Sequence, residues 1–81
     1  MKTEIYAIKD TKVAFQLPFY QPNRAAAIRA FRNGVNTKGS ELNLNASDVE
    51  LWQLGVYDDE TGAIVSKPDF VCTGVSLKNE I

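Results

Sequence analysis

The residue types in this chain of 81 residues leave few routes to catalysis. It has no histidine and one cysteine, which removes Ser-His pairs, Cys-His pairs and zinc sites of the usual kind. The acidic run Asp58–Glu60 could bind a metal, but the following Gly62 favours a solvated hairpin turn. Cys72 lies among apolar neighbours, which favours a small buried side chain over a reactive thiolate. We therefore expect no catalytic residue, no metal and no cofactor, and the protein is not predicted to be an enzyme.

Side chains that could contact phosphate groups are concentrated in the first half of the chain. The arginines are Arg24, Arg29 and Arg32, and all of them fall within one predicted helix. Lys12 and Lys38 lie on either side of that helix, whereas most of the acids follow residue 40. The formal net charge of −1 is therefore the sum of a basic first half and an acidic second half.

This charge distribution has two interpretations. In one, the arginines lie on a solvated helix face and complement acids elsewhere in the domain or on a second subunit. In the other they contact phosphates, with Arg29 and Arg32 about 60° apart around the helix. Aromatic side chains nearby could then stack on unpaired bases. Of these we expect Phe15 and Phe19 to lie in the core and Tyr6 and Tyr20 to be free.

Alternating and helical patterns predict the elements that would position these side chains. Apolar residues alternate strictly through Val13–Phe19, which is the clearest strand pattern in the chain, and Pro18 makes it an edge strand or its end. Val49–Tyr57 is a second strong strand, followed by a hairpin turn that closes at Gly62. A first strand is expected at Glu4–Lys9, and the hairpin continues into Ala63–Val65 until Pro68 interrupts it. A further strand could follow at Phe70–Leu77, weakened by Gly74.

The predicted helix spans Arg24–Val35. Asn23 is its expected N-cap, and Gly34 and Asn36 mark its end. Its apolar residues fall on one stripe, which should face a sheet. They are Ala27, Ile28, Phe31 and Val35.

These elements predict a small α+β fold within a single domain, residues 1–81. We expect an antiparallel sheet of four or five strands with one helix on one face, in the order β-β-α-β-β with room for a further β. Residues 36–48 are an internal polar connector, and residues 70–81 are either a last strand or a partly disordered tail. The chain shows no signal-peptide pattern and no membrane span, so we expect a cytosolic protein that does not contact membrane.

One helix can cover only one face of a sheet, so the other face should need a partner. Within Val49–Tyr57, Val49 and Leu51 are expected to face the helix, and Trp52, Leu54 and Val56 the other side. We interpret these last three as an interface, most simply with a second copy of the chain in a homodimer. The alternative is that Trp52 is an ordinary core residue.

The chain resembles the small nonstructural protein of gokushoviruses, a group of single-stranded-DNA phages in the Microviridae. The resemblance rests on I-Y-A-I-K-D at Ile5–Asp10, F-Q-L-P-F at Phe15–Phe19, A-I-R-A-F at Ala27–Phe31 and the segment Leu51–Ile64. Trp52 stands where the family commonly has tyrosine, and Tyr57 where phenylalanine is common. The resemblance extends to about Pro68, and the tail matches only in character.

The resemblance implies a protein that acts in the cytoplasm of the infected bacterium and is absent from the mature virion. It further implies DNA binding during viral single-stranded DNA replication or packaging. The expected contact residues are Arg24, Arg29, Arg32, Lys12, Lys38 and Tyr20. Such contacts would be salt-dependent and weakly sequence-specific. The alternative is an adaptor that binds a viral replication, scaffolding or packaging protein, or a host protein, through Trp52, Leu54 and Val56 without touching DNA.

Overall fold

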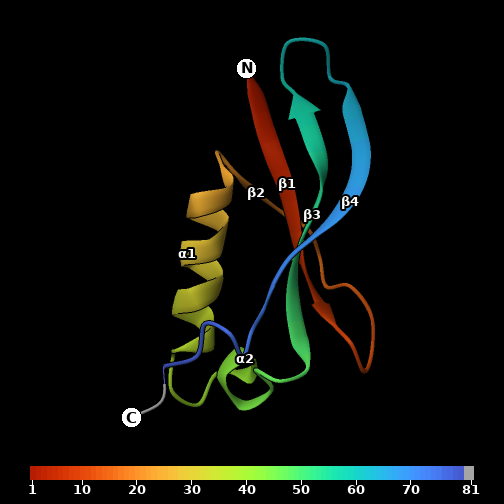
Figure 1. Cartoon of the computed structure of the whole chain (residues 1–81). Helices are drawn as coiled ribbons and strands as arrows, with labels where there is room; N and C mark the ends of the chain where they lie inside the picture. The colour runs from red at the N-terminus through yellow and green to blue at the C-terminus, as the bar shows by residue number, and fades with distance from the viewer. Residues whose placement is uncertain (80–81) are drawn as a thin grey trace.

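A computed structural model describes residues 1–79 and consists of one antiparallel sheet with a helix packed on one face (Figure 1). The sheet has four strands in the spatial order β2-β1-β3-β4. This confirms the α+β fold and the β-β-α-β-β order that the sequence predicts. The elements are β1 (Lys2–Asp10), β2 (Phe19–Gln21), α1 (Arg24–Val35), α2 (Glu41–Leu44), β3 (Val49–Asp58) and β4 (Ile64–Thr73).

Helix α1 begins and ends at the residues that its sequence predicts. The side chain of Asn23 accepts a hydrogen bond from the backbone N–H of Ala26 at 2.8 Å, which caps the first turn. At the other end, the Asn36 backbone N–H donates to the Arg32 carbonyl, and its side-chain amide donates to the same oxygen. The cap on each side therefore satisfies backbone groups that a helix of 12 residues leaves unpaired.

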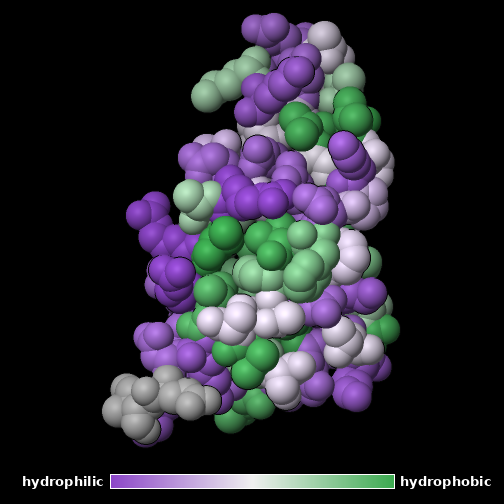
Figure 2. All heavy atoms as spheres, in the orientation of Figure 1, coloured by the Kyte–Doolittle hydropathy of each residue, from purple (hydrophilic) through white to green (hydrophobic). Residues whose placement is uncertain are grey.

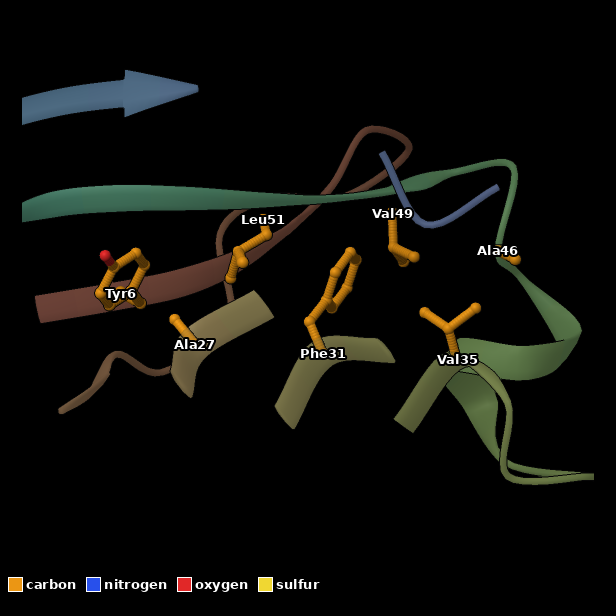
Figure 3. Packing of buried hydrophobic residues seen from close by; sticks show 7 residues of the cluster. All are labelled: Tyr6, Ala27, Phe31, Val35, Ala46, Val49 and Leu51. Atoms are coloured by element: carbon orange, nitrogen blue, oxygen red, sulfur yellow. The ribbon is translucent and has the colours of Figure 1, made fainter. Parts of the chain in front are cut away.

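The core lies between α1 and the middle of the sheet (Figure 3). Ala27, Phe31 and Val35 project from one side of the helix and are almost completely buried. They face Tyr6 of β1 and Leu51 of β3, and the remaining members of the cluster are Ala46 and Val49. Helical spacing puts the first group on one side of α1, and alternation puts Tyr6 and Leu51 on the sheet face that α1 covers, so the two groups pack against each other.

The hairpin between β3 and β4 forms as the sequence predicts. Gly62 has a φ of 75°, a left-handed conformation that glycine adopts without steric cost, and its N–H donates to the Asp58 carbonyl. Gly55 allows β3 and β4 to approach closely, because a Cβ at this position would lie 2.1 Å from the Val65 carbonyl oxygen. Together these glycines bring β4 back along the full length of β3.

The prediction of a strand at Val13–Phe19 is wrong over most of its length. The chain turns immediately after β1, where the Asp10 N–H donates to the Ala14 carbonyl, and only Phe15 forms an isolated bridge with Lys9. Val13 and Leu17 are 83% and 90% exposed, so the alternation does not correspond to a buried face. The ladder resumes only at Phe19, after Pro18, which cannot donate a backbone hydrogen bond.

The end of the chain also differs from its prediction. β4 is one strand from Ile64 to Thr73 that passes through Pro68, and residues 74–79 contain no further strand. β4 lies at the edge of the sheet, where a missing N–H on the open side breaks no ladder. Residues 74–79 return towards α1, and the Asn36 side chain donates to the Leu77 carbonyl. The last two residues of the predicted tail, 80 and 81, lie outside the described residues.

The connector at 36–48 is more structured than its polar composition suggests. It contains the short helix α2, whose N-cap Ser40 accepts a hydrogen bond from the Asn43 N–H. The Asn43 side chain in turn donates to the Val35 carbonyl, which fastens α2 to the end of α1. Polar side chains of the connector therefore serve as local caps.

The sheet is longer than the helix that covers it. In Figure 1 the start of β1 and the β3–β4 hairpin extend past the first turn of α1 and form a projecting arm. Ile64 and Val65 on this arm are 61% and 63% exposed, and Figure 2 shows apolar surface beside the hairpin.

Candidate nucleic-acid and partner interfaces

The outer side of α1 carries two arginines without acidic partners. Arg29 and Arg32 are both exposed, while Ala27, Phe31 and Val35 occupy the buried side of the same helix. No acidic residue occurs in α1, and within residues 1–79 neither arginine forms an ion pair. These two guanidinium groups are therefore available to an anion from solvent. Arg32 lies in the last turn of α1, where the negative end of the helix dipole stabilises a positive charge.

Arg24 has a different environment from the other two arginines. Its Nη2 donates to Asp69 Oδ2 of β4 and to Gln53 Oε1 of β3, each at 2.9 Å. The hydrogen bond with Asp69 is the main cause that raises the pKa of Arg24. This side chain ties the first residue of α1 to two strands, so its charge is already partly neutralised.

The other predicted nucleic-acid contacts are spread around the molecule. Lys12 lies in the turn after β1, and Lys38 follows the C-cap of α1. Tyr20 pairs with Ile5 and lies on the sheet face away from the helix, because its neighbour Phe19 packs against the core on the helix side. The structure thus brings Arg29 and Arg32 together on α1 and places Tyr20 on the opposite side of the sheet.

The sheet face opposite α1 bears a row of aromatic rings. The Trp52 ring makes edge-to-face contacts with Phe15 and Phe70, with centroids 5.7 and 5.8 Å apart. Its indole N–H donates to Glu50 Oε1 at 3.0 Å. Phe15 and Phe70 are each 44% exposed, so the expectation that Phe15 is a core residue is wrong. We call Phe15, Trp52 and Phe70 the aromatic row.

A lysine lies against the aromatic row. The Nζ of Lys9 is 5.4 Å from the centre of the Phe15 ring and 5.3 Å from that of Trp52, which are cation–π distances. Further along the same face, the Tyr20 and Tyr57 rings lie 6.2 Å apart. The open face therefore combines half-exposed rings with a charged group.

The predicted interface of Trp52, Leu54 and Val56 is divided by a bulge in β3. Ile5 pairs with Gly55 and Tyr6 pairs with Gln53, so Leu54 has no cross-strand partner. This shift places Val56 opposite Glu4, whose carboxylate accepts a hydrogen bond from the Tyr6 hydroxyl on the helix side. Val56 therefore faces away from Trp52, which corrects the predicted face.

On the helix side, Val56 lines a shallow cleft of the projecting arm. Val56, Val65 and Ala63 contribute apolar side chains to its lining, and Lys2, Lys67 and Asp58 lie around it. The cleft begins at Asp69, whose ion pair with Arg24 marks the edge of the sheet surface that α1 covers. The cleft continues the core surface, and neither helix in the described part of the chain covers it.

The groups whose pKa is shifted include Cys72 and the acids of the β3–β4 hairpin. Burial raises the pKa of the Cys72 thiol, an effect that nearby Arg32 and Arg24 oppose, so the thiol is held in its protonated form. The backbone N–H of Glu60 donates to Asp58 Oδ1 at 3.0 Å and lowers the pKa of Asp58. In the acidic hairpin, Asp59 also accepts a hydrogen bond from the amino group of Met1 at 2.6 Å. These acids thus organise the turn between β3 and β4.

Two site features escaped the sequence patterns. Lys9 and Phe70 face the same side as Trp52 because Ala7 and Phe70 are its cross-strand partners, and Lys9 is two residues beyond Ala7. Alternation around Trp52 would have suggested this grouping once the strand pairing was known.

None of the helices in residues 1–79 is long and apolar enough to cross a membrane.

The fold is that of a small α+β protein, with a four-stranded antiparallel sheet and α1 packed on one face. A family model described as "Phage ORF5 protein" matches residues 3–77. Because this match covers almost the whole chain, the chain belongs to the Phage ORF5 protein family. The phage origin implied by the resemblance is thereby confirmed. No curated protein and no solved structure matches the chain.

Proposed function

We propose that this phage protein binds single-stranded DNA through the outer side of α1, by salt-dependent and weakly sequence-specific contacts. It acts in the cytoplasm of the infected host during replication or packaging of a single-stranded genome, as expected of a gokushovirus nonstructural protein outside the mature virion. The observation that carries the proposal is the pair Arg29 and Arg32, both exposed, on a helix without acids.

The physical argument is electrostatic. Arginine forks form bidentate hydrogen bonds to phosphate, and each phosphate that they neutralise releases condensed counterions into solution. The overall net charge of −1 provides no global attraction, so binding depends on this local charge and weakens steeply as salt rises. Lys38 lies beyond the helix end, and Arg24 contributes less because Asp69 already binds it.

A titration of fluorescently labelled single-stranded DNA at low and high salt tests the proposal. We expect binding at low salt, weaker binding at high salt, and little dependence on base sequence. Absence of binding at low salt would refute the proposal. The same titration with duplex DNA establishes whether the strand must be single.

The second candidate function is that of a protein-interaction adaptor. It is favoured by the aromatic row, since aromatic side chains are enriched in protein interfaces, and Trp residues among binding hot spots. In this case a viral replication, scaffolding or packaging protein, or a host protein, covers Trp52. A change of Trp52 fluorescence on mixing with such a protein, without any DNA binding, would favour the adaptor.

A further inference from the structure

The sheet face opposite α1 presents an apolar surface, and neither helix of the described residues 1–79 covers it. The aromatic row crosses this face from the loop after β1 through β3 to the edge strand β4. Beneath and beside it, Ile5 and Ala7 of β1 are buried, so the apolar character continues into the sheet. A two-layer α+β domain with one helix leaves such a face without a second layer.

The open face also carries one positive and one negative charge side by side. Lys9 of β1 and Glu50 of β3 are cross-strand partners. Glu50 accepts a hydrogen bond from Trp52, while Lys9 lies over the Phe15 and Trp52 rings, and within residues 1–79 the two charges form no ion pair. Both charged groups retain hydrogen-bonding capacity for a partner.

This pattern of charge is self-complementary. If a second copy packs against the open face about a two-fold axis near Trp52, Lys9 of each copy can meet Glu50 of the other. A nucleic-acid strand fits the face less well, because the Glu50 carboxylate beside Trp52 would repel its phosphates. Charge complementarity therefore favours a second copy of this chain over DNA on this side of the molecule.

We propose that two copies of this chain form a two-fold dimer through their open faces, with the aromatic rows in contact and Lys9 paired with Glu50 across the axis. The helices then lie on the two outer sides of the dimer. Arg29 and Arg32 are displayed twice, facing in opposite directions. The dimer itself does not depend on the proposed function, whereas the double display of DNA-binding arginines rests on it.

Charge exchange combined with measurement of molecular mass tests the dimer. For the wild type, light scattering should give twice the 9.0-kDa mass of one chain. Lys9→Glu puts two acids opposite each other across the axis, and Glu50→Lys puts two cations there. Each variant alone should dissociate at least ten-fold more readily than the wild type.

An equimolar mixture of the two variants distinguishes an interface effect from an effect on folding. In the mixed dimer every contact between positions 9 and 50 again joins opposite charges, so the mass of two chains should return. Repulsion within one chain cannot be relieved by mixing, which separates an interface effect from misfolding. Lys67→Glu makes the same charge change outside the open face and should leave the dimer intact.

Several results would overturn the dimer. These are a wild type with the mass of one chain at all concentrations, single variants as dimeric as the wild type, or no recovery on mixing. Quenching of Trp52 by oligothymidylate, but not by an abasic strand of the same length, in a monomeric wild type would assign the face to nucleobases instead. DNA binding by a monomeric wild type would leave the proposed function standing while the dimer fails.

Discussion

Arg24 and Asp69 join the start of α1 to the edge strand β4, with Nη2 and Oδ2 2.9 Å apart. The contact spans 45 positions of sequence and includes Gln53 of β3, which accepts from the same nitrogen. The contact lies at the edge of the sheet surface that α1 covers, where the projecting arm begins. An arginine that sequence analysis groups with the DNA contacts thus has a structural partner.

Replacing Arg24 with alanine should have a small effect on stability and on DNA binding. Both side chains of the ion pair are about half exposed, at 45% and 58%, and such pairs contribute roughly 0.2–1 kcal/mol. We therefore expect Arg24→Ala to lower the free energy of unfolding in urea by no more than about 1 kcal/mol. A double-mutant cycle with Asp69→Ala isolates the pair, and a coupling energy of zero would show that it contributes nothing.

Gly55 should be intolerant of any side chain. An added Cβ would lie 2.1 Å from the Val65 carbonyl oxygen, which belongs to the backbone and cannot move without displacing β4. We expect Gly55→Ala to cost more than about 3 kcal/mol of unfolding free energy or to abolish cooperative unfolding. Urea denaturation followed by circular dichroism measures this.

Gly39→Ala is the matched control for that substitution. Gly39 has a φ of 81° but nothing within 4 Å of the added Cβ, so only the backbone conformation is penalised. Its expected cost is about 1 kcal/mol. Equal costs at the two positions would contradict the close approach of β3 and β4.

The buried Tyr6 hydroxyl should make the protein less stable at high pH. Burial, followed by the hydrogen bond to Glu4, raises the pKa of Tyr6 from 10.0 to about 12. Between these values the unfolded chain loses this proton before the folded one, so the free energy of unfolding falls as pH rises. In Tyr6→Phe this contribution should be absent, which urea denaturation at pH 9 to 12 can measure. Identical pH dependence in the two proteins would contradict the burial of the hydroxyl.

Cys72 should react slowly with thiol reagents while the protein is folded. The side chain packs against the core, and burial raises its pKa, so both access and thiolate content are reduced. We expect labelling by a disulfide reagent at neutral pH to be more than about ten-fold slower in buffer than in urea. Similar rates under both conditions would show that the thiol is exposed.

The parts of the fold that sequence predicts well have determinants within a few residues. Asn23 caps α1 through its own side chain, and the helical spacing of Phe31 and Val35 is sufficient to identify the buried side. The hairpin depends on Gly62 and its immediate neighbours. Such local determinants can be recognised without knowledge of the rest of the molecule.

The errors arise where a strand depends on its partner. Val13 and Leu17 have the alternating apolar pattern of a strand. The turn after Asp10 leaves them without a neighbouring strand to pair with, so their side chains remain exposed. Pro68 indicates a break, yet at a sheet edge it is tolerated within β4. The bulge at Leu54 reverses the side on which Val56 lies, and it is defined by the register of β3 with β1 and β4, which alternation along β3 does not contain.

The same reasoning explains what could be predicted of the candidate site. The sequence alone places Arg29 and Arg32 near each other, because both lie on one helix, whose period is fixed. Lys9 was missed, since its position beside Trp52 depends on the register between β1 and β3. The prediction that Tyr6 is free is wrong, because this side chain lies completely buried under α1.

The salt dependence of single-stranded DNA binding tests the central claim most directly. The slope of log K against log salt should be shallower by about 1.4 in Arg29→Ala/Arg32→Ala than in the wild type, if each arginine neutralises one phosphate. Lys2→Ala/Lys67→Ala removes the same charge from the projecting arm and should retain the wild-type slope. Equal slopes for the wild type and the arginine variant, or no binding at low salt, would contradict the account.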